Sequence, residues 1–500
     1  MAEFGKVFLI GAGPGELGLL TLKGLEIIKK ADCIIYDRLL NPRMLSYAPI
    51  NSEKIFVGKA NHHHTMPQDE INQLLFEKAK EYQVVVRLKG GDPYVFGRGG
   101  EEALFLLERG VDVDVVQGVS SSVAALASAG IPITHRGLSK GFQVITAHSK
   151  KDEPTNIDYT KLTDPEVTLV FLMGLAHVGE IARELMKVGR SQDTPVAVIS
   201  NGTTNHQRKC VSTLANIEAE VEAAQLQSPS IIVVGDVVTL SEELAFFENR
   251  PLFGKTYFLP VITAFDYSWK NGVVDNTRNH LEDELIEKGA VVIRVDAGRI
   301  SAVRASLSFW ESALQNDYIV FTSANGVKAF FWNLKEVQKK DVRALAGLKF
   351  AVIGQKTSDT LAEFGIVADV ISEKQNSQDL AQELNKIISP QTKVFWLCSS
   401  TPSEDLEKHL SVPVEKIVCY ENIENEIELS EPEQERILES DGAIFTSGSN
   451  ARFGLKILGG SLPKNIYSIG PVCTKAIKEA GFEKIHQAQI SSYQGIIDLL

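Results

Sequence analysis

The chain has 500 residues, of which 44% are hydrophobic and 23% charged, and a formal net charge of −13. These values suit a globular protein of roughly three or four compact units and exclude a general nucleic-acid binder, which would carry a basic surface. No apolar run reaches membrane-spanning length, and the first residues lack the layout of a signal peptide. The five cysteines are scattered and have no CxxC spacing. We therefore expect a cytoplasmic protein without disulfides and with no metal site.

The first half alternates predicted strands with predicted helices. Residues 6–12 (KVFLIGA) read as a buried strand, 33–38 (CIIYDR) as a second strand that ends in Asp37 and Arg38, and another strand runs to Val57. Helical patterns follow the first and third of these strands. This alternation predicts an α/β fold with a largely parallel sheet.

The stretch 87–102 (RLKGGDPYVFGRGGEE) follows a β-branched run and precedes a helical pattern. Glycines let a backbone approach a ligand closely, and Pro93 keeps Asp92 out of a helix. Loops at the carboxyl ends of strands are where open α/β sheets bind ligands. Without other motifs, a glycine-rich connector with no ligand explains this stretch equally well.

The domain organisation follows from composition and from a repeat. We expect a first domain at 1–245, with lobes at about 1–138 and 139–245, and a second at 251–500. In the second, DYIVFTSANGVKAFFWNL is echoed by DGAIFTSGSNARFGLKIL, and LKFAVIGQKTSDTLAEFGI by KNIYSIGPVCTKAIKEAGF. This repeat predicts two pseudo-symmetric α/β lobes facing each other across a cleft. Their Thr/Ser-rich turns suit carboxylate ligands, although helix N-caps explain any one such turn.

The segment GAGPGELGLLTLKG departs from a dinucleotide-binding fingerprint. Its glycines stand at 11, 13 and 15, so the third comes one residue early and Glu16 takes its place. Pro14 also removes a backbone donor that a pyrophosphate would use. These departures argue against an NAD-dependent enzyme.

Several motifs together resemble a known family. GAGPGELGLLTLKG, YDRL, VGKA, HTMPQDEIN, VVRLKGGDPYVFGRGGEE and LVFLMGL with NGT occur in the order found in the uroporphyrinogen-III C-methyltransferases of the tetrapyrrole methylase family. From PLFGK onward, FTSANGVKAF, DVRALAG, FTSGSN and SIGPVCTKAIKEAGF resemble uroporphyrinogen-III synthases. The resemblance implies a two-lobed tetrapyrrole methylase fold followed by a bilobed α/β synthase fold.

That resemblance implies a bifunctional enzyme of tetrapyrrole biosynthesis. It would methylate uroporphyrinogen III at C2 and C7 to precorrin-2, using S-adenosylmethionine, and cyclise hydroxymethylbilane to uroporphyrinogen III, a lyase reaction. Sirohaem and cobalamin remain open as destinations. It also implies a homodimer through the methyltransferase half. By resemblance, the S-adenosylmethionine site comprises Pro14, Gly90, Gly91, Asp92, Val95, Ser120, Ser121, Met173 and Gly202.

By the same resemblance Asp37 is the proton acceptor, and Lys59 a proton donor or substrate contact. The other cations expected at the substrate's carboxylates are Arg38, Arg87, Lys89, Arg98 and Arg136. Simpler interpretations exist: Asp37 next to Arg38 is typical of a surface ion pair, and Met173 in an apolar strand is typical of a core. His62–His64 lack an acidic or cysteine partner at ligand spacing, which disfavours a metal.

In the second half, Tyr420 matches the tyrosine that the family resemblance marks as catalytic. The substrate-binding candidates there are Ser323, Ser447, Ser449 and Thr474. TYFLPVITAFDYSWK and FWLCSSTPSEDL depart from the family, each at a place that usually carries an arginine. Two alternatives therefore stay open: an active methyltransferase joined to a non-catalytic synthase-like binding module, or a related methylase with another acceptor.

Overall fold

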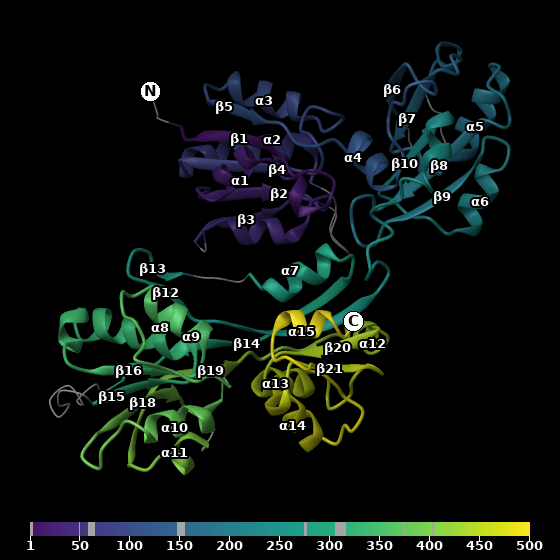
Figure 1. The fold of residues 1–500 in the computed structure, drawn as a ribbon. Helices are drawn as coiled ribbons and strands as arrows, with labels where there is room; N and C mark the ends of the chain where they lie inside the picture. Colours follow the sequence, from purple (N-terminus) through teal and green to yellow (C-terminus); the bar gives the residue numbers. More distant parts are fainter. Residues whose placement is uncertain are drawn as a thin grey trace. The chain divides into compact units, whose positions relative to one another are not determined.

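The computed structural model describes residues 4–49, 51–58, 66–147, 156–274, 278–305, 317–374, 376–402 and 405–500. The chain divides into two compact units, both α/β (Figure 1). One comprises Met1–Lys255 and Leu285–Val291, and the other Thr256–Glu284 and Val292–Leu500.

The first lobe of the N-terminal unit contains a five-stranded sheet in the order β3-β2-β4-β1-β5. Its strands are β1 (Lys6–Gly11), β2 (Cys33–Tyr36), β3 (Glu53–Phe56), β4 (Val84–Lys89) and β5 (Val113–Val116). All four pairings are parallel, as predicted. The carboxyl ends of all five strands therefore lie at one edge, which gathers the loops that follow them.

Helices cover both faces of this sheet because alternate side chains of its strands are buried on opposite sides. Its helices are α1 (Leu22–Ile28), α2 (Gln68–Glu81) and α3 (Gly99–Leu107). Leu9 of β1 packs with Leu75 of α2 and Leu106 of α3, whereas Ile10 packs with Ile28 of α1. Helix α1 begins where the Thr21 hydroxyl accepts a hydrogen bond from the Gly24 N–H at 3.2 Å.

The second lobe contains a mixed sheet in the order β6-β7-β10-β8-β9. Its strands are β6 (Gly141–Thr146), β7 (Val167–Leu172), β8 (Pro195–Ser200), β9 (Arg208–Thr213) and β10 (Ser230–Val234). Only β6 and β7 run parallel to each other as neighbours. Since β7 and β8 are both antiparallel to β10, their carboxyl ends share one edge.

Helix α4 (Ser121–Ser128) links the two lobes of this unit. It follows β5 of the first sheet in the sequence, yet its Leu126 packs with Ala197 and Val233 of the second sheet. Helices α5 (Val178–Lys187) and α6 (Ile217–Ala223) cover the opposite face of that sheet. The amino end of α4 therefore lies beside the first lobe's loops while its body belongs to the second lobe's core.

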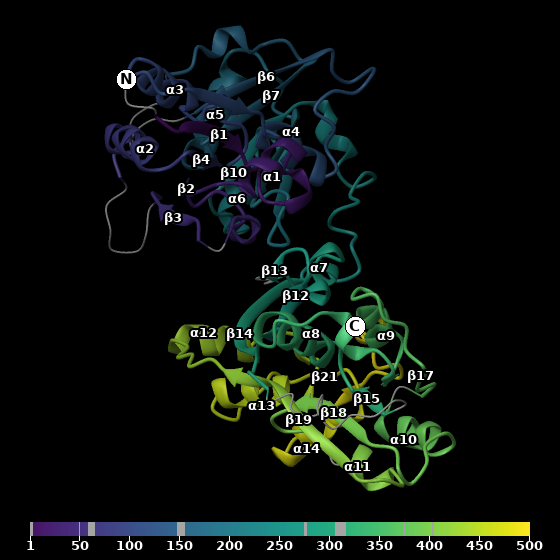
Figure 2. The same ribbon diagram turned by 90° about the vertical axis from the view of Figure 1, so that its left-hand side faces the viewer.

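The C-terminal unit is organised by one ten-stranded sheet in the order β17-β16-β15-β18-β19-β14-β11-β20-β21-β22. The strands are β11 (Thr256–Thr263), β14 (Val291–Ala302), β15 (Tyr318–Phe321), β16 (Lys349–Val352), β17 (Val370–Ile371), β18 (Val394–Ser399), β19 (Val414–Glu424), β20 (Gly442–Phe445), β21 (Ile466–Ser468) and β22 (His486–Gln487). The long strands β14 and β19 pair with each other and join the two ends of the sheet (Figure 1, Figure 2). A separate hairpin pairs β12 (Asp266–Ser268) with β13 (Gly272–Val274).

Helices flank both ends of this sheet. They are α8 (Ala324–Trp332), α9 (Gln355–Ala362), α10 (Ser377–Asn385), α11 (Asp405–His409), α12 (Glu431–Leu438), α13 (Gly448–Ile457), α14 (Pro471–Glu479) and α15 (Tyr493–Ile497). The residues of α7 (His280–Glu287) are divided between the two units. Helices α8 and α9 lie on one side of β15, β16 and β18, and α10 and α11 on the other (Figure 1).

The sequence repeat has a structural counterpart. The order β15, α8, β16, α9 recurs as β20, α13, β21, α14, and both strand pairs are parallel. Asp317 and Asp441 precede the equivalent strands, and each carboxylate accepts a backbone N–H at 2.8 Å, from Lys393 and Thr256 respectively. In both lobes, an aspartate at the equivalent position therefore connects the equivalent strand to its neighbour in the sheet.

Candidate active sites

In the N-terminal unit, three loops meet backbone to backbone at the carboxyl edge of the first sheet. Gly13 and Gly91 exchange hydrogen bonds, N–H to O distances being 3.1 and 2.8 Å. A Cβ at Gly118 would lie 2.1 Å from the Gly91 oxygen and 2.7 Å from the Gly11 Cα. Any larger residue at 118 would separate the loops that follow β1, β4 and β5.

Asp92 fastens two of these loops together. Its Oδ2 accepts the Gly118 N–H at 3.0 Å and its Oδ1 accepts the Tyr94 N–H at 2.8 Å. Beside it, Gly91 has φ +69°, and the only atom within 4 Å of a Cβ built there is the Ser121 nitrogen, at 3.9 Å. Gly91 therefore faces the amino end of α4 at ordinary contact distance.

The second lobe contributes the loop after β8 to the same region. A Cβ at Gly202 would lie 2.4 Å from the Ala125 Cβ of α4, and one at Gly15 would lie 2.6 Å from the Thr204 Cγ2. The Glu16 N–H donates to the Thr203 hydroxyl at 3.3 Å. The loop containing Pro14 therefore packs against the loop containing Gly202.

Left-handed backbone conformations concentrate in these loops. Of the seven described non-glycine residues with positive φ, five lie here, with φ between 51° and 68°: Phe96, Arg98, Met173, Asn201 and Thr203; Gln225 and Lys339 lie elsewhere. Such conformations carry strain and cluster at ligand sites, where the surrounding packing maintains them. Met173 follows β7 and is half-exposed, at the edge where β8 also ends.

The remaining residues predicted for the cofactor lie in the same loops. Pro14 is half-buried and Val95 is 37% exposed. Ser120 caps α4: its hydroxyl accepts the Ser122 N–H at 3.3 Å and lies 2.8 Å from the Ser122 hydroxyl. Ser121 opens the helix.

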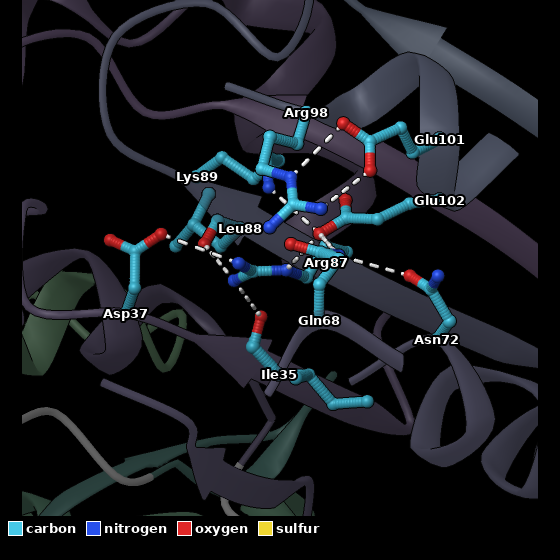
Figure 3. Close-up of polar contacts among 10 residues, drawn as sticks. All are labelled: Ile35, Asp37, Gln68, Asn72, Arg87, Leu88, Lys89, Arg98, Glu101 and Glu102. Atoms are coloured by element: carbon cyan, nitrogen blue, oxygen red, sulfur yellow. Dashed lines mark hydrogen bonds and ion pairs between the residues drawn. The ribbon is translucent and has the colours of Figure 1, made fainter. Parts of the chain in front are cut away.

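A network of charged side chains lies under the loop after β4 (Figure 3). Arg87, Lys89 and Glu102 are 3%, 5% and 0% exposed. Glu102 Oε1 accepts hydrogen bonds from Lys89 Nζ at 2.8 Å and Arg87 Nε at 3.3 Å. Gln68 Nε2 donates to the same oxygen at 3.2 Å. Burial, followed by repulsion from Arg87, lowers the pKa of Lys89, and Glu102 opposes that shift.

This burial changes the interpretation of two predicted substrate contacts. Arg87 and Lys89 were expected to meet substrate carboxylates, but the structure directs both into the interior, where each donates a hydrogen bond to Glu102. In contrast, Arg38, Arg98 and Arg136 are exposed or half-exposed. Arg98 donates to Glu101 at 2.6 and 3.0 Å.

Asp37 lies at the end of β2, between this network and solvent. Its Oδ2 is 3.4 Å from Arg87 Nη2, and its Oδ1 accepts the Leu39 N–H at 3.0 Å. The side chain is 25% exposed. Lys59 and His62–His64 lie outside the described residues.

Sequence reasoning missed Glu102 and Gln68. The signal for Glu102 was available: the buried face of α3 comprises Gly99, Glu102, Ala103 and Leu106, which is the spacing of an apolar stripe. An acid on such a stripe requires a buried partner, and Arg87 and Lys89 supply it.

In the C-terminal unit, Tyr420 and Ser323 come together as a hydroxyl pair. The Tyr420 phenol lies 2.9 Å from the Ser323 hydroxyl, which also caps α8 by accepting the Gly326 N–H at 3.1 Å. Tyr420 is 9% exposed, and burial raises the pKa of its phenol. A pocket of about 290 Å³ adjoins the pair, lined by Ser323, Ala324, Asn325, Ile353, Gly354, Lys356 and Thr357.

The other predicted residues of this half belong to the second repeat. Ser447 caps α13 by accepting the Asn450 N–H at 3.1 Å. The Ser449 hydroxyl accepts hydrogen bonds from Asn422 at 3.3 Å and Arg452 at 3.2 Å. Thr474, near the start of α14, lies 2.5 Å from the Ser468 hydroxyl. These hydroxyls support the turns, and only Ser323 among them lines the pocket just described.

Neither a helix that could span a membrane nor a cluster of metal ligands is found in the described part of the chain. No helix there combines the length and apolar content of a membrane span. No three His, Cys, Asp or Glu side chains in those ranges come together as metal ligands would.

Each half of the chain matches a known protein family. Residues 6–218 match the family described as tetrapyrrole (corrin/porphyrin) methylases, and residues 279–498 match uroporphyrinogen-III synthase HemD. The uroporphyrinogen-III C-methyltransferase of Bacillus subtilis is 36% identical, over 83% of this chain and 85% of that protein. The porphyrin biosynthesis protein HemD of Ruminiclostridium josui is 35% identical, over 81% of this chain and 78% of that protein.

Among solved structures, one match is the uroporphyrin-III C-methyltransferase of Thermus thermophilus in complex with S-adenosylhomocysteine. It is 40% identical, with a TM-score of 0.41, and the match covers 47% of this chain and 93% of the Thermus chain. The two relatives that extend over most of both chains carry the assignment, since each is at least 35% identical over at least 78% of its own length. The chain therefore belongs to the tetrapyrrole methylase family, in the form in which the methylase is followed by a uroporphyrinogen-III synthase HemD region.

Proposed function

We propose that the N-terminal unit methylates uroporphyrinogen III at C2 and C7 to give precorrin-2, with S-adenosylmethionine as donor. We further propose that the C-terminal unit forms uroporphyrinogen III from hydroxymethylbilane. The full-length similarity to a uroporphyrinogen-III C-methyltransferase supports the first reaction, and the HemD match supports the second. The domains at 1–245 and 251–500 would then carry consecutive steps.

The observation that carries the first proposal is the meeting of the glycine loops. Among the described residues outside its chain neighbours, a Cβ built on Gly91 would contact only the Ser121 nitrogen, at 3.9 Å, and the Gly13–Gly91 bridge holds backbone close to it. Backbone groups that meet in this way would suit a ligand with amine, carboxylate and ribose hydroxyl groups. When bound there, S-adenosylmethionine would supply an electrophilic methyl group. Pro14, Val95, Met173 and the other residues predicted for this site are proposed to contact that donor.

The protein's own contribution is orientation and proton transfer. Asp92 and Gly202 hold the loops in place, which fixes where an electron-rich ring carbon can approach the donor. Asp37, one-quarter exposed at the end of β2, would accept the proton that the methylated ring loses.

The carboxylates of the substrate require cations that reach solvent. We assign Arg38, Arg98 and Arg136 to them, because Arg87 and Lys89 are already bound to Glu102 inside the lobe. Guanidinium groups pair with carboxylates through two parallel hydrogen bonds, which also fixes orientation.

In the second unit, Tyr420 with Ser323 would donate a proton to the departing hydroxyl of hydroxymethylbilane. Their hydroxyls lie 2.9 Å apart beside the pocket, and Lys356 adds a cation to its lining. The alternative is a synthase-like module that binds without catalysis. It is favoured by the segments TAFDYSWK and SSTPSEDL, which lack the arginines that the family resemblance led us to expect.

The test is to give the purified full chain hydroxymethylbilane, with and without S-adenosylmethionine, and to identify the products by absorbance and mass. We expect uroporphyrinogen III without the donor and a doubly methylated product with it. If the chain methylates added uroporphyrinogen III but does not convert hydroxymethylbilane, the second unit is a binding module. Failure of both reactions would contradict the proposed substrates.

A further inference from the structure

Glu102 is buried completely, and all its hydrogen bonds converge on one oxygen. Oε1 accepts from Lys89, Arg87 and Gln68, at 2.8, 3.3 and 3.2 Å. Among the described residues, Oε2 has no hydrogen-bond partner although it is also buried. A buried carboxylate that leaves one oxygen unused is costly, so its retention indicates a role for the charge itself.

Arg87 connects this carboxylate to Asp37. Its Nη1 donates to the carbonyls of Leu88 at 3.2 Å and Ile35 at 3.5 Å, while its Nη2 faces Asp37 Oδ2 at 3.4 Å (Figure 3). Every nitrogen of the guanidinium is therefore directed at a protein oxygen. Glu102 holds the inner end of this planar group and Asp37 meets its outer end.

The charges also balance across the network. Arg87 and Lys89 carry two positive charges, and Glu102 and Asp37 two negative ones. Without Glu102, two buried cations would face the single carboxylate of Asp37. The Arg87 Nε would also lose its charged partner, so the guanidinium that meets Asp37 Oδ2 would no longer be fixed at its inner end.

We propose that Glu102 is a positioning residue for methyl transfer: by fixing Arg87, it keeps the Asp37 carboxylate at the end of β2, directed at the substrate. This inference rests on the proposed methyltransferase function and adds to it a residue that touches neither substrate nor donor. It also gives Arg87 and Lys89 a role in the interior.

The unused oxygen makes a clean substitution available. In Glu102→Gln, the amide oxygen can keep the place of Oε1, and the NH2 group takes the place of Oε2, where no described donor opposes it. Only the charge is removed. Glu102→Asp keeps the charge and withdraws it by one methylene. The matched control is Glu53→Gln, which loses an ion pair to Lys78 (2.8 Å) at the opposite edge of the same sheet.

We expect Glu102→Gln to lower kcat for uroporphyrinogen III methylation by roughly 10- to 100-fold, as a misplaced catalytic group does. The Kd for S-adenosylhomocysteine, measured by calorimetry, should stay within about twofold, because the glycine loops are untouched. Glu102→Asp should recover part of kcat. Glu53→Gln should match the unmodified chain in both measurements.

A second variant separates positioning from charge compensation. Lys89→Met combined with Glu102→Gln removes the buried cation and anion together. If Glu102 acts through Arg87, this double variant regains thermal stability but not kcat. Recovery of kcat along with stability would show that Glu102 only neutralises Lys89, and would overturn the proposal.

The controls distinguish this inference from the proposed function. If the unmodified chain and Glu53→Gln transfer no methyl groups, the proposed function itself fails. If both are active and Glu102→Gln keeps its kcat, Glu102 is not a positioning residue. If Glu102→Gln does not fold, the kcat of the double variant decides, because its remaining charges, Arg87 and Asp37, are balanced.

Discussion

Asp92 offers the most direct perturbation of the loops that form the candidate donor site. Its two oxygens accept the Gly118 and Tyr94 N–H groups at 3.0 and 2.8 Å. Hydrogen bonds to a charged group contribute about 1.5–3 kcal/mol each. Asp92 is half-buried, so water replaces part of this and the lower limit applies. We expect Asp92→Ala to destabilise the closed loops by about 3 kcal/mol, twice that lower limit.

Because the proposed donor site requires those loops to be closed, the loss should appear in ligand binding. Titration calorimetry with S-adenosylhomocysteine should show Kd rising about 100-fold, since 1.4 kcal/mol corresponds to a tenfold change. Asp92→Asn keeps the shape of the side chain but can accept only one of the two N–H groups. Its Kd should therefore lie between those of the unmodified chain and Asp92→Ala. Asp112→Asn, which loses an exposed pair with Lys6, is the control. An Asp92→Ala chain that binds within about twofold of the control would refute this account of the site.

Further substitutions test other parts of the account. Gly202→Ala would place a Cβ 2.4 Å from the Ala125 Cβ, so α4 must shift; we expect a loss of about 1–3 kcal/mol, seen as a lower Tm together with weaker S-adenosylhomocysteine binding. Tyr420→Phe removes the 2.9 Å contact with Ser323 and should lower hydroxymethylbilane turnover at least tenfold if the phenol donates a proton. The free energy of unfolding should fall by only about 1 kcal/mol. Burial raises the pKa of the Tyr420 phenol, so the stability that the protonated phenol contributes is complete below pH ~10 and is lost as the pH rises further. Denaturant unfolding measured between pH 8 and 11 would detect this loss. Burial also raises the pKa of Cys398 and Cys473 to about 11 and of Cys33 to about 12, so at pH 8 a thiol reagent should label Cys210, the least buried cysteine, well before the others; fast labelling of a second thiol in the folded protein would contradict the packing described.

The sequence predicted the elements whose signals are local. β-branched runs predicted the strands, and the glycines at 90 and 91 predicted a place where backbone approaches closely. The 317–334 repeat predicted paired strand–helix units, because each unit carries its own turn and cap. Gly118 received its role only from the structure, as its neighbours Gly11 and Gly91 are distant in the chain.

Longer-range relationships could not be predicted in this way. Helix α4 is an ordinary Ala-rich helix in the sequence, and nothing local indicates that Leu126 packs on the second sheet. Arg87 and Lys89 have the spacing of one strand face, but their cationic character favoured a ligand over the interior. Only the buried stripe of α3, with Glu102 on it, explains their position. The left-handed conformations of Met173 and Thr203 likewise depend on packing around them.

The central claim is that the N-terminal unit methylates two specific carbons of uroporphyrinogen III. The direct test supplies the full chain with uroporphyrinogen III and S-adenosylmethionine carrying a ¹³C-labelled methyl group, and locates the label by NMR under anaerobic conditions. The account predicts two labelled methyl groups, at C2 and C7, and none in an Asp37→Ala chain that still binds S-adenosylhomocysteine. Label at other carbons, or no label in the unmodified chain, would contradict it.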